Sequence, residues 1–110
     1  MRYVAAAAMI VWAGAAQADW VALSGAEIEA ALTDRKLEYA AAWQEFRASG
    51  RTLYNAGRDS WGYWAVRGDQ YCSQWPPGDL WDCYDMEQHP DGRLRFVAGD
   101  GSATEGRYAE

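Results

Sequence analysis

Residues 61–75 read WGYWAVRGDQYCSQW, two runs of aromatic and β-branched residues on either side of the dipeptide Gly68-Asp69. Such a pattern is typical of a β-hairpin with a two-residue turn. Because side chains alternate between the two faces of a strand, the turn also predicts which residues lie opposite one another. Counting outward from it gives the pairs Arg67 with Gln70, Val66 with Tyr71, Ala65 with Cys72, and Trp64 with Ser73.

The first eighteen residues have the features of an export signal. Arg2 supplies a short positive region, residues 4–13 form an apolar run, and residues 16–18 (AQA) match the small-x-small pattern that precedes cleavage. The apolar run is short for a membrane span. We therefore expect residues 1–18 to be a signal peptide, residues 19–110 to be one domain that does not span a membrane, and the mature protein to be periplasmic or secreted.

Two cysteines, Cys72 and Cys83, occur in this exported chain. An even number of cysteines in an oxidising compartment favours a disulfide, and two cysteines allow one pairing. Their spacing does not match a C-x-x-C redox motif, and the single histidine, His89, precedes a proline in an apparent turn. A structural bridge is therefore favoured over a redox pair or a metal site, and chain entropy gives it a stabilising effect of about 3 kcal/mol.

Two further alignments extend the register of the predicted hairpin. A bridge between neighbouring strands would place Tyr71 opposite Tyr84, and a type I turn at residues 90–92 with Gly92 in the left-handed region would pair the strands after it. The second alignment gives Glu87 opposite Arg95 and Met86 opposite Phe96. One face then carries the apolar residues Gly62, Trp64, Val66, Tyr71, Tyr84, Met86, Leu94 and Phe96. The other face carries Arg67, Gln70, Gln74, Asp85, Glu87, Arg93 and Arg95.

Short runs with strand composition recur along the chain from residue 35, separated by brief turns. Breaks this short can join only antiparallel neighbours. The expected strands are Arg35–Tyr39, Trp43–Arg47, Arg51–Asn55, Trp61–Arg67, Gln70–Trp75, Asp82–Glu87, Arg93–Val97 and Thr104–Tyr108. We predict a mainly β fold, an antiparallel up-and-down meander curled into a small barrel or half-barrel.

A short helix is expected before the strands, over residues 25–32. Ser24 and Glu27 match a capping box, and Leu23 with Ile28 match a hydrophobic staple. The apolar stripe of this helix is narrow, so the helix must dock on a larger body. Trp61 and Tyr63 face outward in the predicted register, and either the helix covers them, which we expect, or they form an exposed aromatic patch.

The motif at residues 62–72, G-x-W-x-V-x-G-D-x-Y-C, resembles a family of small exported bacterial proteins of unknown function. In that family an acidic loop and a second Cys follow, an L-S-G-x-E-I helix precedes, and a D-G turn leads to a final R-L-R-F strand. Residues 23–28 and 91–96 match the last two features. The resemblance implies the fold and assigns no catalytic residue.

Composition argues against several classes of function. Sixteen acidic residues against ten basic ones give a net charge of -6, which disfavours a nucleic-acid partner. No glycine-rich loop precedes a helix, residues 99–102 offer one carboxylate where calcium needs several, and we expect no cofactor or metal. Asp85 and Glu87 share a face and leave a carboxylate-based hydrolase as the weakest alternative, because Glu87 facing Arg95 favours a surface charge pair. No catalytic residue is assigned.

Binding is therefore the expected activity, and two modes of binding compete. The loop between Trp75 and Trp81 is stiffened by two prolines and a nearby disulfide, so it could present tryptophans to a protein or cell-envelope component, as an inhibitor does, with Trp61 and Tyr63 as further candidates. The other interpretation of Trp75 and Trp81 is that they close the open end of the barrel. The alternative is a carrier of a small apolar ligand in a pocket lined by Trp64, Tyr71 and Tyr84. An eight-stranded barrel just holds its own side chains, so we expect a filled interior. The oligomeric state stays open.

Overall fold

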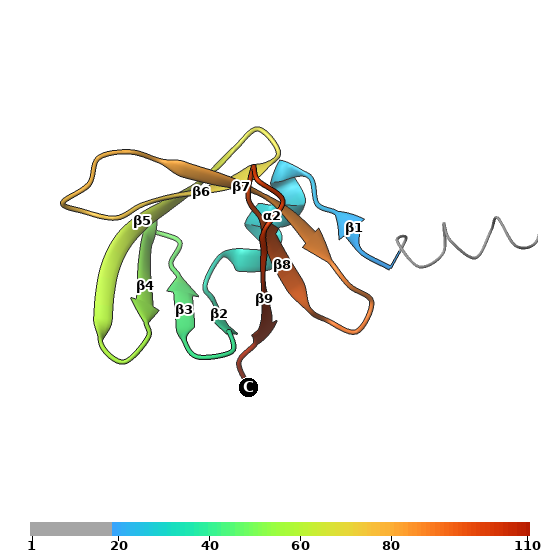
Figure 1. The fold of residues 1–110 in the computed structure, drawn as a ribbon, viewed down its shortest axis with the longest axis horizontal. Coiled ribbons are helices and arrows are strands. Elements are labelled where there is room, and N and C mark those ends of the chain that lie inside the picture. Colours follow the sequence, from blue (N-terminus) through green and yellow to red (C-terminus); the bar gives the residue numbers. More distant parts are fainter. Residues whose placement is uncertain (1–18) are drawn as a thin grey trace, which may run out of the picture.

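Eight antiparallel strands form a closed barrel in the computed structural model, which describes residues 19–110 (Figure 1). The predicted signal peptide, residues 1–18, lies outside the described residues. The barrel strands are β2 (Arg35–Glu38), β3 (Trp43–Phe46), β4 (Arg51–Asn55), β5 (Asp59–Arg67), β6 (Gln70–Gln74), β7 (Asp82–Gln88), β8 (Leu94–Val97) and β9 (Ala103–Tyr108). Each strand pairs with the next in the chain, and β2 also pairs with β9, which closes the circle. The predicted barrel is confirmed.

The predicted register is confirmed at all three alignments. Trp64 lies opposite Ser73, Tyr71 opposite Tyr84, and Met86 opposite Phe96. Gly92 has a φ of 98°, in the left-handed region that the turn before β8 requires. Side-chain alternation therefore puts the predicted apolar set on the inner wall of the barrel.

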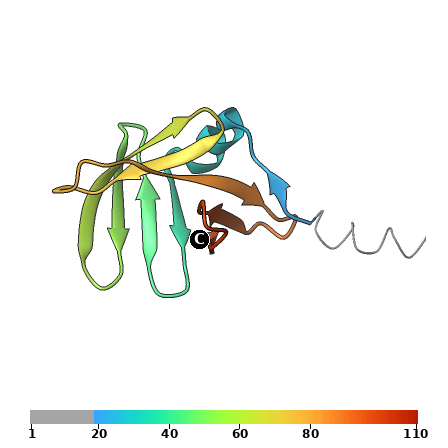
Figure 2. The ribbon, with the colours of Figure 1, turned by 45° about the horizontal axis from the view of Figure 1, so that its top comes forward.

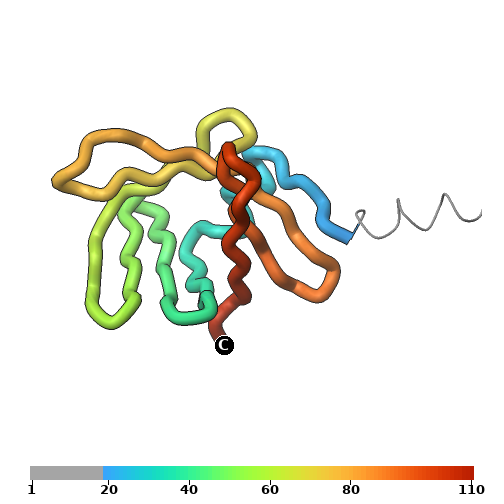
Figure 3. Tube along the Cα trace, viewed as in Figure 1, coloured from blue at the N-terminus to red at the C-terminus, as the bar shows by residue number. Residues whose placement is uncertain are grey.

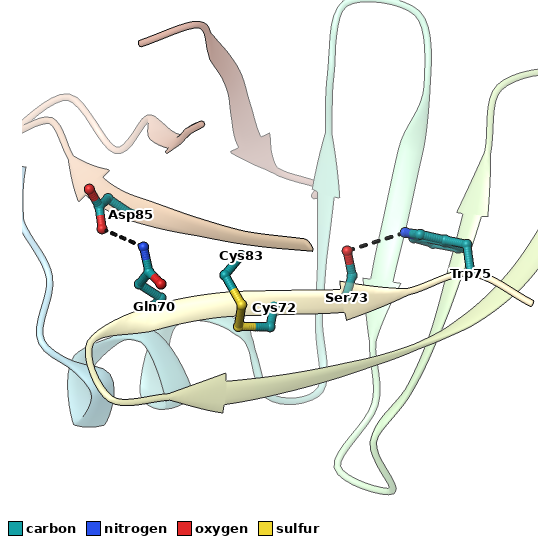
Figure 4. Close-up of a disulfide and its surroundings, with 6 residues drawn as sticks. All are labelled: Gln70, Cys72, Ser73, Trp75, Cys83 and Asp85. Atoms are coloured by element: carbon teal, nitrogen blue, oxygen red, sulfur yellow. Dashed lines mark hydrogen bonds between the residues drawn. A yellow bond between two sulfur atoms is a disulfide. The ribbon is translucent and has the colours of Figure 1, made fainter. Parts of the chain in front are cut away.

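Cys72 and Cys83 form the expected disulfide, which joins β6 to β7 on the outer wall (Figure 4). Gln70 donates a hydrogen bond to Asp85 across the same two strands. Beyond Ser73 and Trp75 the two strands separate into the β6–β7 loop, which extends past the body of the barrel at the left of Figure 2. The bridge therefore holds the base of this loop.

The helix α2 (Gly25–Leu32) has the predicted capping box, with Ser24 and Glu27 each bonded to the other's backbone amide. It closes one end of the barrel beside the β5–β6 turn, where the Gly25 amide donates to Asp69 at 2.7 Å (Figure 1). Its apolar residues Ile28 and Leu32 are fully buried. The expectation that α2 covers Trp61 and Tyr63 is wrong, because the narrow stripe plugs the barrel end instead of packing on the outer wall.

The N-terminal segment differs from the prediction, and most predicted strands begin or end one or two residues away from the observed bounds. A two-residue strand, β1 (Val21–Ala22), pairs with the end of β7 and brings the chain to α2. Strand β5 begins at Asp59, because residues 59 and 60 continue the pairing with β4. No helix within residues 19–110 is long and apolar enough to cross a bilayer.

The hydrophobic core occupies the half of the barrel next to α2. Phe46 is fully buried at its centre, with its ring centroid 5.7 Å from that of Trp64 and 5.8 Å from that of Tyr71. The buried members of the core are Ile28, Leu32, Leu37, Phe46, Trp64, Tyr71, Met86, Leu94 and Phe96. The helix and these side chains fill only this half of the barrel, and the other half contains the cavity described next.

Candidate ligand-binding cavity

The barrel end opposite α2 is hollow and holds a cavity of about 1040 Å³. Its lining comes from the inner wall and from the loops at that end, β2–β3, β4–β5 and β6–β7, together with the start of β9. The tube in Figure 3 shows the β2–β3 and β4–β5 turns side by side, away from the β5–β6 turn where α2 sits. The expectation of a completely filled interior is therefore wrong, because within residues 19–110 no helix closes this end.

Aromatic side chains dominate the inward-facing wall of the cavity. The rings of Tyr54 and Trp75 meet edge to face at 6.0 Å, and those of Tyr71 and Tyr84 lie 6.1 Å apart. Small residues surround the rings at the open end. The lining includes Tyr39, Tyr54, Tyr71, Trp75, Tyr84 and Phe96, with Ala40, Ala41, Ala42, Ala56 and Ala103 nearer the loops. Rings with polar tips and an open mouth are typical of sites for small molecules.

Two glycines allow two of these rings to lie close to the barrel wall. A Cβ atom at Gly62 would lie 2.6 Å from the Trp75 ring, and one at Gly106 would lie 2.8 Å from the Tyr39 ring. Real Cβ atoms do not approach other atoms this closely, so any side chain at these positions would push the rings toward the centre. The glycines therefore contribute to the width of the cavity.

A chain of hydrogen bonds crosses the floor of the cavity around Gln44, which is 6% exposed. Tyr39 donates to Gln44 Oε1 at 2.7 Å, and Gln44 Nε2 lies 2.9 Å from Thr52 Oγ1 and 3.2 Å from the Tyr71 hydroxyl. At the side, Trp75 Nε1 donates to Ser73 Oγ at 3.2 Å (Figure 4). These polar atoms are held in fixed positions between the rings.

Burial keeps the two phenols on the floor protonated. It raises the pKa of Tyr71 to about 12, and it raises the pKa of Tyr39 further still. Both groups are therefore neutral at any pH a cell envelope reaches, and they act there as hydroxyl donors and acceptors.

The cavity is also free of net charge along its inner wall. Among residues 19–110 the lining contains no lysine, arginine or histidine. Its one ionisable acid, Glu105, has its carboxylate 3.0 Å from the Arg93 guanidinium. Some arginines of residues 19–110 instead stack on rings that do not line the cavity, such as Arg67 over Trp81 and Arg35 over Tyr108. A charged ligand would therefore enter without a counterion, which is unfavourable.

The sequence-predicted pocket residues are only partly brought together. Tyr71 and Tyr84 line the cavity, as the carrier alternative expects. Trp64 does not, because it lies toward the α2 end, where its indole Nε1 donates to the Arg47 carbonyl at 2.9 Å. That position belongs to the filled half of the barrel.

The two tryptophans of the β6–β7 loop lie in different environments. Trp75 lines the cavity, next to Tyr54. Trp81 is half-buried with the Arg67 guanidinium 4.4 Å from its ring centroid. Because residue 75 keeps the inward alternation of Tyr71 and Ser73, the two indoles do not form one exposed anchor. Leu80 is the large aliphatic side chain that the loop exposes, at 78%.

Trp61 and Tyr63 remain exposed on the outer wall, at 40% and 42%. The guanidinium of Arg51 lies over both rings, 4.7 and 5.6 Å from their centroids. Of the two alternatives for these residues, the exposed patch is the one observed. Trp61 also belongs to the lining of the cavity, whereas Tyr63 does not.

The acids and the histidine considered from the sequence have partners on the outer wall or in turns. Arg95 binds Glu87 at 2.6 Å, the predicted cross-strand pair, and Gln70 binds Asp85. His89 accepts a hydrogen bond from the Asp91 amide. Within residues 19–110 no three metal-binding side chains lie close enough to hold an ion.

Sequence reasoning missed several cavity residues, notably Tyr39, Gln44, Tyr54 and Ser73. Alternation contains a signal for them. Tyr39 follows the buried Leu37 by two residues, so it shares the inner face with Leu37. Gln44 precedes the buried Phe46 by two residues and shares the inner face with Phe46 for the same reason. The signal is a change from apolar to polar-tipped residues toward one end of each strand.

No protein-family model, no curated protein and no solved structure matches this chain.

Proposed function

We propose that this protein is a non-enzymatic binding protein that holds a small, neutral, largely apolar molecule in the open half of its barrel. The observation that carries the proposal is the cavity of about 1040 Å³ lined by aromatic rings. Cavities of roughly 300–1,000 Å³ suit drug-sized ligands. The ligand would stack on rings such as Tyr54 and Trp75, and its apolar body would leave water.

In this proposal the protein is exported and binds its ligand in the periplasm or outside the cell. The disulfide supports this part, because such bonds persist in oxidising compartments. A carrier there would keep a poorly soluble molecule out of water between two membranes or two proteins. The α2 end would stay closed, and the loops at the opposite end would admit and release the ligand.

A variant that fills the mouth tests the proposal. Thr104 lies opposite the inward-facing Phe96 and lines the cavity, so Thr104→Trp adds an indole over the opening. Titration with the neutral fluorescent probe N-phenyl-1-naphthylamine is expected to show saturable binding to residues 19–110 and at least about tenfold weaker binding to Thr104→Trp.

The control adds the same ring to the outside of the same strand. Arg107 faces outward, does not line the cavity, and is 61% exposed, so Arg107→Trp should bind the probe as the unchanged protein does. Equal binding by all three proteins would place the probe outside the cavity, and no saturable binding by the unchanged protein would also contradict the proposal.

Recognition of a protein or envelope component is the second candidate, and it is favoured by the outer patch of Trp61 and Tyr63 with Arg51 over both rings. Exposed aromatic and arginine side chains are enriched at interfaces. Loss of an envelope partner in Tyr63→Ala, with unchanged probe binding, would support this function in addition to the cavity.

A further inference from the structure

The direction of the hydrogen bonds on the cavity floor can be worked out from one end of the chain. Thr52 Oγ1 lies 2.7 Å from the backbone carbonyl oxygen of Glu45. A carbonyl only accepts, so the single hydroxyl hydrogen of Thr52 points there. The side-chain amide of Gln44, 2.9 Å from the same Oγ1, must therefore present its NH₂ group to Thr52.

This orientation fixes the remaining bonds of Gln44. Its Oε1 faces Tyr39, whose phenolic hydrogen is consumed by donating to it at 2.7 Å. Its Nε2 lies 3.2 Å from the Tyr71 hydroxyl oxygen and donates its second hydrogen there, so Tyr71 accepts in this bond. The hydrogen of the Tyr71 hydroxyl is left for another partner.

The Ser73 hydroxyl, like that of Tyr71, acts as an acceptor in the hydrogen bond that the structure shows for it. Its Oγ accepts from Trp75 Nε1, so its own hydrogen is also left. Residues 71 and 73 are two apart on β6, so both side chains lie on its inner face and line the cavity. Burial raises the pKa of Tyr71, and hydrogen bonding with Ser73 lowers it by a smaller amount. One bond between them uses one hydrogen. At least one hydroxyl hydrogen of this pair then has no acceptor in the network, although both residues are nearly buried and line the cavity.

We propose that the ligand carries a neutral hydrogen-bond acceptor, such as the carbonyl oxygen of a ketone, ester or amide, that receives this hydrogen from the Tyr71–Ser73 pair. The inference rests on the proposed function and specifies the ligand class. A buried donor that is left without an acceptor among residues 19–110 favours a ligand that supplies one. A carboxylate also accepts, but the lining among residues 19–110 offers it no cation.

Two probes of the same shape test the inference. In 2-acetylnaphthalene a C=O group stands where 2-isopropenylnaphthalene has C=CH₂, so the two differ in the acceptor. Titration of residues 19–110, followed by tryptophan fluorescence, should show the ketone binding about fivefold to tenfold more tightly. The anion 2-naphthoate should bind more weakly than the ketone.

Variants then locate the donor. Tyr71→Phe should reduce the preference for the ketone, and Tyr71→Phe combined with Ser73→Ala should remove it. Tyr108→Phe is the matched control, because that hydroxyl donates to the Ala31 carbonyl and does not line the cavity. It should keep the preference of the unchanged protein. Melting curves on each variant check that the barrel is folded at the assay temperature.

The infrared carbonyl band of bound 2-acetylnaphthalene gives a readout that does not depend on affinity. Hydrogen bonding lowers this frequency, so the band should lie lower in the unchanged protein than in the double variant. Equal affinities for ketone and alkene, or a preference that survives the double variant, would overturn the inference and leave the proposed function standing. Failure of both probes to bind would overturn the proposed function, and the inference with it.

Discussion

Phe46→Ala is expected to lower the free energy of unfolding by about 3–5 kcal/mol, the range for truncating a fully buried phenylalanine. Phe46 has no exposed surface and touches the rings of Trp64, Tyr71 and Phe96 at the centre of the filled half. Its neighbours are fixed by the closed barrel and cannot collapse into the space. Chemical denaturation of residues 19–110 measures the change.

The comparison variant removes a ring from the hollow half. Tyr54 is half-buried and lines the cavity, so Tyr54→Ala should cost less than about 2 kcal/mol, because part of its surface already faces the open space. Similar costs for the two variants would contradict the division of the barrel into a filled half and a hollow half.

Loss of the disulfide is expected to have the second large effect. Replacing both Cys72 and Cys83 by alanine should lower the free energy of unfolding by about 3 kcal/mol, because the bridge limits the freedom of the unfolded chain over a separation of 11 residues. Denaturant unfolding of the variant, beside the unchanged protein with and without a reducing agent, measures it.

Reduction should destabilise the unchanged protein by a similar amount and leave the double variant unaffected, which serves as the control. The bridge lies at the base of the β6–β7 loop, which supplies Trp75 to the cavity. A double variant as stable as the oxidised protein would show that pairing of β6 with β7 needs no covalent support.

Much of the fold could be predicted because each turn fixes a register. Gly68-Asp69 defined the pairing of β5 with β6, and Gly92 defined that of β7 with β8. Each register assigns every side chain of its strands to one face. The capping box at Ser24 likewise located α2. Local chemistry is sufficient at these positions.

The position of α2 could not be predicted, because a narrow stripe such as Ile28 and Leu32 fits any apolar surface. Docking on Trp61 and closing the barrel end are both compatible with the sequence. Which of the two positions α2 takes depends on long-range geometry, namely the pairing of β2, which follows α2 directly in the chain, with both β3 and β9. The same geometry leaves the opposite end open.

The cavity was only partly predictable for a related reason. Alternation put Trp64 and Tyr71 on the same inner wall, and both are there. Alternation does not say how far along the barrel axis a residue lies, so it could not separate Trp64 at the closed end from Tyr71 at the cavity floor. The hydrogen-bond network around Gln44 joins three strands and has no sequence motif.

The most direct test of the central claim follows the indole N–H signals by NMR while 2-acetylnaphthalene is added to residues 19–110. The Trp75 signal is predicted to move along a saturating curve, because this ring lines the cavity. The signals of Trp64, in the filled half, and of Trp81, beneath Arg67, should move little. An unchanged Trp75 signal, or a largest change at Trp81, would contradict a ligand site inside the barrel.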